Sequence, residues 1–220
     1  MVIKEINKKY NNMKCSECNM ENKTDARMCE QCGKPLYKKI FISHHKEDKP
    51  KAVALQELLI KVTRTGGHFC SSNPGDLRYG TDWYRQVVEH LENANYIICV
   101  LTKKSYRQPW ILYETGIAKG MNEAKIVVSL LFDIQGNKLN SSPFNINQYC
   151  IDDEEDENLF ALMKQIYEDF HPNANKLCKP IEESIKRDIQ EFKKKIQEEN
   201  TRRKSKKTPK KINKNAMSPM

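Results

Sequence analysis

Short apolar runs alternate with helical patterns through the middle of this chain. Four runs have the length and the Ile, Val, Phe and Leu content of buried strands, and they cover 38–43, 68–72, 96–102 and 125–132. Between them, apolar residues recur three and four positions apart, which predicts amphipathic helices over 49–67, after a cap at Thr81, and over 108–120. Strands that are apolar throughout and alternate with helices indicate a parallel sheet covered on both faces.

The loops that follow the strands are where the sequence predicts a functional crevice. In open α/β sheets, ligands bind beyond the carboxyl ends of the strands, at the point where the strand order reverses. Residues 43–48, 71–80 and 102–109 would form that edge. The helix that leaves it starts at Pro109, and one of its faces is apolar except for Glu114. A carboxylate in an apolar stripe beside this edge is the first candidate for a functional side chain.

The chain continues beyond the alternating region with a helical extension. Residues 133–150 have the composition of a loop with a short final strand, and residues 158–170 predict a helix. A second helix over 180–200 carries apolar residues at near-heptad spacing. This helix is expected to pack on the domain or to pair with a partner, so we assign 151–200 to a helical C-terminal extension.

The positive charge of the protein is concentrated at its C-terminal end. The 220 residues include 38 Lys and Arg and 29 Asp and Glu, for a net charge of +9. Eight of the basic residues and none of the acidic ones lie in 201–220, which leaves 1–200 at +1. We expect 201–220 to be a disordered basic tail, which either binds nucleic-acid phosphates without sequence preference or only keeps the protein in solution.

A compact cysteine-rich unit over 14–36 follows a polar lead-in over 1–13. Four of its cysteines have the spacing C-x2-C-x10-C-x2-C, and they are Cys15, Cys18, Cys29 and Cys32. Two such hooks place four thiolates at the corners of a tetrahedron, which is the geometry of a closed structural zinc site. The unit resembles the zinc-ribbon family and leaves no open metal position for catalysis. Members of that family hold proteins, nucleic acids or no ligand, so the partner of this unit stays open.

No part of the sequence indicates a membrane protein or an exported one. No stretch approaches the roughly 18 apolar residues of a spanning helix, and the N-terminal residues lack the apolar region of a signal peptide. We expect a cytoplasmic protein without a membrane partner, whose cysteines bind metal or stay reduced rather than form disulfides.

Two stretches of the alternating region are diagnostic, "KKIFISHHKEDKP" and "HFCSSNPGDLRYGTDWYRQVVEHLENANYIICVLTKKSYRQPWILYETGIA". Through them the region resembles the Toll/interleukin-receptor (TIR) domain family, in its bacterial form, over about 38–150. The diagnostic features are Ile-Ser-His after the first strand, Cys-Ser-Ser and Gly-Thr-Asp-Trp around a turn-rich loop, and Pro-Trp-x3-Glu at the third helix. The resemblance implies a flavodoxin-like sheet with the first strand central.

The resemblance also implies an activity. Many TIR domains cleave nicotinamide from NAD+ with a glutamate at this position of the third helix, which makes Glu114 the expected catalytic residue. The residues expected to contact NAD+ are Ser43, His44, Ser71, Ser72, Arg78 and Trp110. NAD+ would be a substrate rather than a cofactor, no catalytic metal would be needed, and zinc would be structural.

The same resemblance implies a biological setting. TIR domains self-associate, because the turn-rich loop of one domain helps to complete the site of its neighbour. A role in prokaryotic immunity follows, most directly in antiphage defence, either through NAD+ depletion or through a cyclic ADP-ribose signal. The sequence does not separate hydrolysis from cyclisation.

Other interpretations stay open at this point. Glu114 could serve as a helix cap or pair with Lys119 or Lys103. The protein could be a non-enzymatic adaptor that assembles with other TIR domains, or a nucleic-acid-binding protein that uses its zinc ribbon and basic tail. A dinucleotide-binding dehydrogenase is excluded by the lack of a G-x-G-x-x-G loop after any strand. A response-regulator receiver is excluded because Ser43, His44 and Thr102 stand where receivers carry aspartates.

Overall fold

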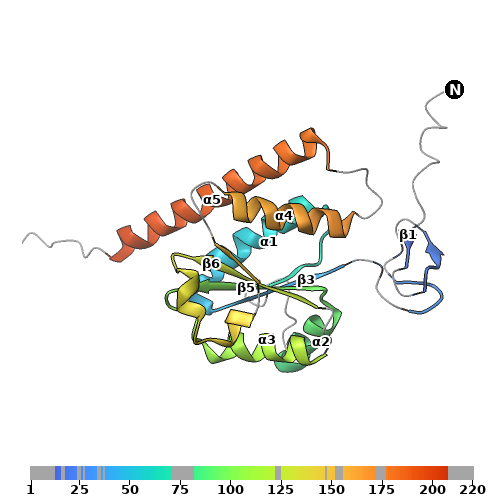
Figure 1. Ribbon diagram of the computed structural model, residues 1–220, viewed down its shortest axis with the longest axis horizontal. Helices are drawn as coiled ribbons and strands as arrows, with labels where there is room; N and C mark the ends of the chain where they lie inside the picture. The colour runs from blue at the N-terminus through green and yellow to red at the C-terminus, as the bar shows by residue number, and fades with distance from the viewer. Residues whose placement is uncertain are drawn as a thin grey trace, which may run out of the picture.

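A five-stranded parallel sheet lies at the centre of the described part of the computed structural model (Figure 1). The structure describes residues 13–15, 18–23, 26, 28–33, 36, 38–70, 82–121, 125–146, 148–151, 156–171 and 177–207. The strands of the sheet are β3 (Ile40–His44), β4 (Phe69–Cys70), β5 (Tyr96–Thr102), β6 (Ile126–Phe132) and β7 (Gln148–Ile151). The predicted α/β class with a flavodoxin-like parallel sheet is confirmed, and β7 is the short final strand expected in the C-terminal loop.

The strand order places a reversal point between β3 and β5. The order across the sheet is β4-β3-β5-β6-β7, so the chain moves to one side of β3 first and then continues from its other side. β3 pairs with β5 from Ile40 opposite Tyr96 to His44 opposite Val100. The loops at the carboxyl ends of β3 and β5 therefore flank the crevice that such sheets use for ligands.

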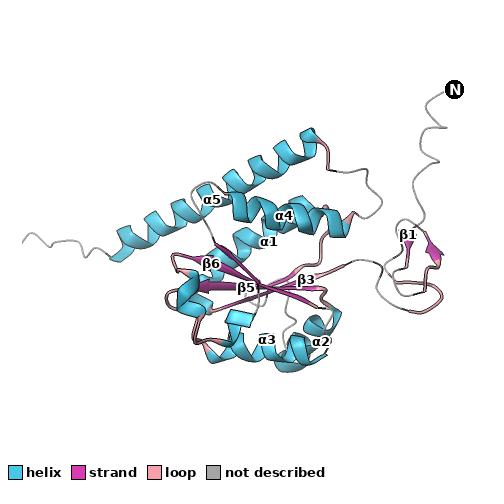
Figure 2. Ribbon diagram, in the orientation of Figure 1, coloured by secondary structure: helices cyan, strands magenta, loops and turns pink. Residues whose placement is uncertain are grey.

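Helices cover both faces of the sheet (Figure 2). One face carries α1 (Lys49–Thr63), α4 (Glu157–Phe170) and α5 (Lys179–Lys207), and the other carries α2 (Trp83–Asn93) and α3 (Pro109–Met121). Short 3-10 turns cover Lys46–Asp48 (η2), Gly136–Leu139 (η3) and Pro143–Ile146 (η4). No helix in the described ranges is long and apolar enough to cross a membrane.

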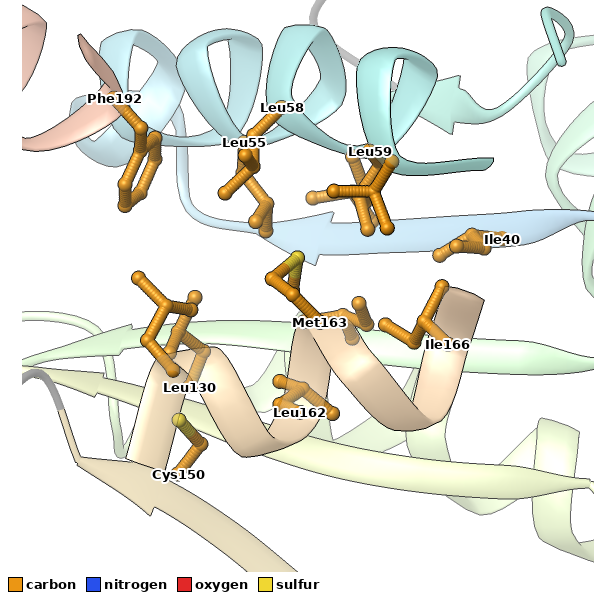
Figure 3. Packing of buried hydrophobic residues seen from close by; sticks show 14 of the residues in the cluster. Ile40, Leu55, Leu58, Leu59, Leu130, Cys150, Leu162, Met163, Ile166 and Phe192 are labelled. Atoms are coloured by element: carbon orange, nitrogen blue, oxygen red, sulfur yellow. The ribbon is translucent and has the colours of Figure 1, made fainter. Parts of the chain in front are cut away.

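The larger core lies between the sheet and the layer of three helices (Figure 3). Leu55, Leu58 and Leu59 of α1 and Met163 of α4 are at most 2% exposed and pack over the strands. The near-heptad stripe of α5 is also buried here, through Ile185, Ile189, Phe192 and Ile196. Of the two arrangements expected for this helix, packing on the domain or pairing with a partner, the structure shows packing on the domain.

Some element boundaries differ from the sequence-based expectations. Helix α1 ends at Thr63 rather than at the predicted residue 67, because Arg64 adopts a left-handed conformation with φ of 54°. Asp82 caps α2 by accepting hydrogen bonds from two backbone N–H groups, whereas Thr81 lies outside the described residues. Helix α5 continues to Lys207, so the expected tail begins within a helix; the side chains of 204–207 are not described.

The cysteine-rich unit contains a two-stranded antiparallel pair, β1 (Met13–Lys14) with β2 (Glu21–Asn22). The backbone N–H of Cys15 donates to Met20 O at 2.9 Å, which closes the first hook into a turn. Gly33 has a φ of 66° directly after the second hook, in the region where a residue without Cβ is favoured. Of the expected lead-in over 1–13, residues 1–12 lie outside the described residues and Met13 begins β1.

Candidate functional site

Glu114 is buried at the junction of α3 with the end of β3. Its side chain is 1% exposed, and both carboxylate oxygens accept a hydrogen bond. The hydroxyl of Ser43 donates to Oε2, and the indole Nε1 of Trp110 donates to Oε1 at 2.6 Å. Among the described residues Glu114 forms no ion pair, so neither Lys119 nor Lys103 is its partner.

The sheet beneath Glu114 is lined with small polar side chains. Ser43, Cys99 and Ser129 lie opposite one another on β3, β5 and β6. Cys99 Sγ lies 3.2 Å from Thr115 Oγ1, the residue that follows Glu114. Small side chains in this row let α3 lie close to the strands, which is what buries a glutamate in the second turn of a surface helix.

Burial changes the protonation of Glu114. Loss of hydration is the dominant cause, and it raises the pKa of this carboxyl to about 7, from 4.5. The hydrogen bonds from Ser43 and Trp110 act in the opposite direction, because they stabilise the carboxylate. The group therefore changes charge near neutral pH, where an ordinary glutamate is fully ionised.

An aromatic cluster adjoins Glu114 on the surface of α2 and α3. The rings of Trp83 and Trp110 lie 4.7 Å apart, and those of Trp110 and Tyr113 lie 5.4 Å apart. The hydroxyls of Tyr84 and Tyr113 are 2.9 Å apart, which links the two helices. Trp83 is 43% exposed, although it lies four residues before the buried Val87, at the spacing of one helix face. The periodicity is misleading at this position because Trp83 is the first residue of the helix and packs on another indole.

Hydrogen bonds tie the loops after β3 and β5 together. Thr102 Oγ1, at the end of β5, donates to Oδ2 of the buried Asp48 at 3.2 Å. Ser105 Oγ accepts from the backbone N–H of Thr102 at 2.9 Å. Lys104 Nζ donates to Glu47 at 3.0 Å across the same gap. These contacts fix both loops at the reversal point, and sequence reasoning missed them because only folding brings residues 47–48 and 102–105 together.

The structure brings only some of the predicted contact residues together. Ser43 and Trp110 contact Glu114 directly. His44 is 5% exposed and follows Ser43 in a strand whose Ile42 packs under α1, so its side chain lies on the opposite face of the sheet from Glu114. Burial lowers the pKa of His44. The other predicted contacts lie outside the described residues, and they are Ser71, Ser72 and Arg78.

The four cysteines of the N-terminal unit converge on one point. Their sulfur atoms all lie within 4.8 Å of one another, with Cys15 to Cys32 and Cys18 to Cys29 both at 3.5 Å. Tetrahedral zinc–thiolate bonds of ~2.3 Å place the sulfurs ~3.8 Å apart, so this set of donors fits a zinc ion. Asn22 Nδ2 lies 3.6 Å from the Cys29 sulfur and would support it as a thiolate.

Comparison with known proteins identifies the domain. The family model of the TIR domain matches residues 40–163, which is more than half of the chain. The chain belongs to the TIR-domain family. Among solved structures, the TIR domains of the activated Roq1 resistosome, which directly recognises the pathogen effector XopQ, are 16% identical. That match covers 71% of this chain and 99% of the other, with a TM-score of 0.41. No curated protein matches the sequence.

Proposed function

We propose that this TIR-domain protein cleaves the nicotinamide–ribose bond of NAD+. The observation that carries the proposal is the position of Glu114. It is a carboxylate at the reversal point of the sheet, held by Ser43 and Trp110 and titrating near neutral pH. Titratable groups with pKa values displaced by burial are concentrated at functional sites. The family adds an independent reason, because many TIR domains use a glutamate in this helix for this reaction.

One carboxylate is sufficient for the chemistry. The ring nitrogen of nicotinamide is cationic in NAD+, so breaking its bond to ribose C1′ returns the electron pair to the ring and releases neutral nicotinamide without a general acid. The ribose is left with oxocarbenium character, which a nearby carboxylate stabilises. Attack of water on C1′ gives ADP-ribose and a proton, whereas attack by an adenine nitrogen gives a cyclic product.

The surroundings of Glu114 fit a cationic aromatic substrate. The indole faces of Trp110 and Trp83 attract the positively charged nicotinamide ring, as aromatic faces attract other cations. Approach of that positive charge favours the ionised form of Glu114. Substrate binding thus converts a partly protonated carboxyl into the anion that the reaction needs.

Glu114 must become accessible before it can act. Trp110 is partly exposed and its indole contacts Oε1, so this ring forms part of the cover over the 1% exposed carboxylate. In the proposed reaction the indole moves aside and Ser43 keeps hold of the other oxygen. Self-association of TIR domains is the expected trigger, with the turn-rich loop of a neighbour completing the site and with Ser71, Ser72 and Arg78 contributing to it.

The zinc ribbon and the biological role belong to the same proposal. Cys15, Cys18, Cys29 and Cys32 would hold one structural zinc ion, which stabilises a unit of about 23 residues that is too small for a hydrophobic core of its own.

A cytoplasmic role in immunity against phage, through NAD+ loss or a cyclic signal, follows from the family.

A non-enzymatic adaptor is the second candidate, and one observation favours it. Both oxygens of Glu114 are already occupied, and the side chain is sealed from solvent. Such an arrangement also serves to join α3 to β3 without any chemistry. The adaptor hypothesis predicts a protein that self-associates and leaves NAD+ intact.

Nicotinamide release separates the two candidates. Purified full-length protein is incubated with NAD+ over a range of protein concentrations, and nicotinamide, ADP-ribose and cyclic products are resolved by chromatography. We expect nicotinamide to appear, at a rate per chain that rises with protein concentration as the domains assemble. Intact NAD+ at concentrations where light scattering shows assembled protein would establish the adaptor instead.

A further inference from the structure

Helix α5 changes character at Ile196. From Lys179 to Asn200 the sequence carries six basic and six acidic residues, and the apolar stripe that packs on α1 and α4 ends at Ile196. The next seven residues, "TRRKSKK" over 201–207, carry five basic residues, no acidic residue and no apolar residue. The helix thus continues for eleven residues, roughly 16 Å, beyond its last apolar contact with the domain.

The charged end of α5 lies at the carboxyl edge of the sheet. In the packed half of α5, Lys195 bridges Glu57 of α1 and Glu191 of α5, and Lys193 pairs with Asp156. These contacts show that α5 runs antiparallel to α1. The C-terminal end of α5 therefore lies near the first residues of α1. There Arg203 Nη1 donates to the backbone oxygen of Glu47 at 2.8 Å. In Figure 1 this end of α5 projects past the domain.

More basic side chains lie next to this contact. Lys104 binds the carboxylate of the same Glu47 from the loop after β5. The exposed basic residues of η2 and of that loop are Lys46, Lys103, Lys104 and Arg107. Of the acidic residues nearby, Glu47 and Glu199 are each bound to a basic side chain and Asp48 is buried, whereas Glu198 is exposed one turn before Arg202. Cations from three segments thus lie beside one another, and we define the surface as Lys46, Lys103, Lys104, Arg107, Arg202 and Arg203, from which α5 continues through the basic sequence 204–207.

We propose that this surface binds the phosphate backbone of a nucleic acid. The six basic-rich residues 202–207 of α5 span roughly 9 Å, and that length of duplex presents roughly five phosphates, whereas NAD+ has two. A lipid surface fits poorly, since the protruding helix has no apolar face to insert. Arginine and lysine without aromatic neighbours at 201–207 favour contact with phosphates over stacking on bases, so binding is expected to be independent of sequence. The proposal stands whether or not the protein cleaves NAD+.

Binding is measured with the full-length protein and a fluorescein-labelled mixed-sequence duplex of about 30 base pairs, by anisotropy between about 50 and about 200 mM salt. The test variant combines Arg202→Gln, Lys204→Gln, Lys206→Gln and Lys207→Gln, and spares Arg203. Its matched control removes four charges from the packed half of the same helix, through Lys179→Gln, Lys186→Gln, Arg187→Gln and Lys194→Gln. Glutamine keeps helix propensity close to that of lysine and arginine, and circular dichroism checks that both variants retain their helix.

We expect the test variant to bind at least about tenfold more weakly at low salt, and the slope of log K against log salt to fall by about three to four. The control variant should bind like the wild type. Equal losses of affinity in both variants would show that only the total charge attracts the duplex, and this would overturn the proposal. Wild-type protein that does not bind the duplex would overturn it as well.

Two further arms test the location and the ligand class. A full-length variant with Lys210→Gln, Lys211→Gln and Lys214→Gln should retain most of the affinity, and abolished binding would move the site into the tail and contradict the assignment. Polyglutamate and phosphatidylserine vesicles, matched in charge concentration, should compete weakly. Binding of either as tight as that of the duplex would replace nucleic acid with an acidic protein or a lipid surface.

Discussion

The indole Nε1 of Trp110 lies 2.6 Å from Oε1 of Glu114, one helical turn further along α3. This hydrogen bond holds a buried carboxyl group whose other oxygen accepts from Ser43, and it does so from a ring that is itself partly exposed. The pair therefore connects the protonation of a buried group to a side chain that ligands and neighbouring molecules can reach.

Replacement of this donor should shift the pH dependence of activity. Trp110→Phe keeps an aromatic face but removes the N–H that stabilises the Glu114 carboxylate, so the pKa of Glu114 should rise above about 7. We expect the midpoint of the rise in nicotinamide release with pH to move upward. Tyr113→Phe, which keeps its ring on the same helix, is the control and should leave the midpoint in place. An unchanged midpoint in Trp110→Phe would show that the indole N–H does not affect the ionisation on which turnover depends.

The raised pKa of Glu114 also predicts a pH-dependent stability. The unfolded chain releases this proton near pH 4.5 and the folded protein near pH 7, so the folded state binds more protons between these values. The contribution of Glu114 to the free energy of unfolding is fully present below pH 4.5 and is lost as the pH rises through 7. The total loss is roughly 3 kcal/mol.

Glu114→Gln does not titrate and should escape that loss. Its amide can accept from Trp110 and donate to Ser43, so the fold should tolerate it. Denaturant unfolding at several pH values should show that the unfolding free energy of the variant increases relative to that of the wild type as the pH rises from 4.5 to 7. A constant difference over this range would mean that Glu114 is ionised throughout.

Lys125 should contribute strongly to the stability of α2. Its buried ammonium group donates to the backbone oxygens of Leu91, Glu92 and Ala94 at 2.7 to 2.9 Å, where the helix ends. Leu91 O also accepts from the backbone N–H of Ala94 at 3.3 Å. Lys125→Met removes the donor from the oxygens of Glu92 and Ala94 and should cost about 2 to 3 kcal/mol of unfolding free energy. Lys138→Met, at an exposed lysine, should cost less than about 0.5 kcal/mol. Equal effects of the two changes would contradict this role.

Elemental analysis should find one zinc ion per chain in protein purified without chelator. Cys29→Ser removes a ligand and should abolish tight binding, whereas Cys178→Ser, at an exposed cysteine outside the cluster, should not. Because the ribbon and the TIR domain form separate units in sequence, zinc removal should leave the unfolding of the TIR domain unchanged. Stoichiometric zinc in Cys29→Ser would place the metal elsewhere.

The sheet could be predicted because its strands are apolar throughout. A run such as 96–102 is buried on both faces, so its burial and its extended conformation have the same cause, and the alternation with helices then determines a parallel arrangement. The position of Glu114 near the crevice followed from the same logic. The ends of helices were less predictable, since Arg64, which is not a glycine, takes the left-handed conformation that ends α1 before the predicted residue 67.

The partners of Glu114 could not be derived from local sequence. Ser43 is 71 residues away and meets Glu114 only because β3 lies beneath α3. Trp110 has the right spacing, but periodicity does not tell which way an indole N–H points. The exposed position of Trp83 depends likewise on a contact between two helices, α2 and α3, that no single stretch of sequence encodes.

The central claim is that Glu114 performs chemistry on NAD+, and one comparison tests it most directly. Nicotinamide release and melting temperature are measured side by side for the wild type, Glu114→Gln and the exposed control Glu89→Gln, at concentrations where all three assemble alike. The proposal predicts a folded Glu114→Gln protein whose melting temperature is equal or higher and whose turnover falls by roughly 10²-fold or more, with Glu89→Gln at the wild-type rate. A folded Glu114→Gln protein that releases nicotinamide at the wild-type rate would contradict it.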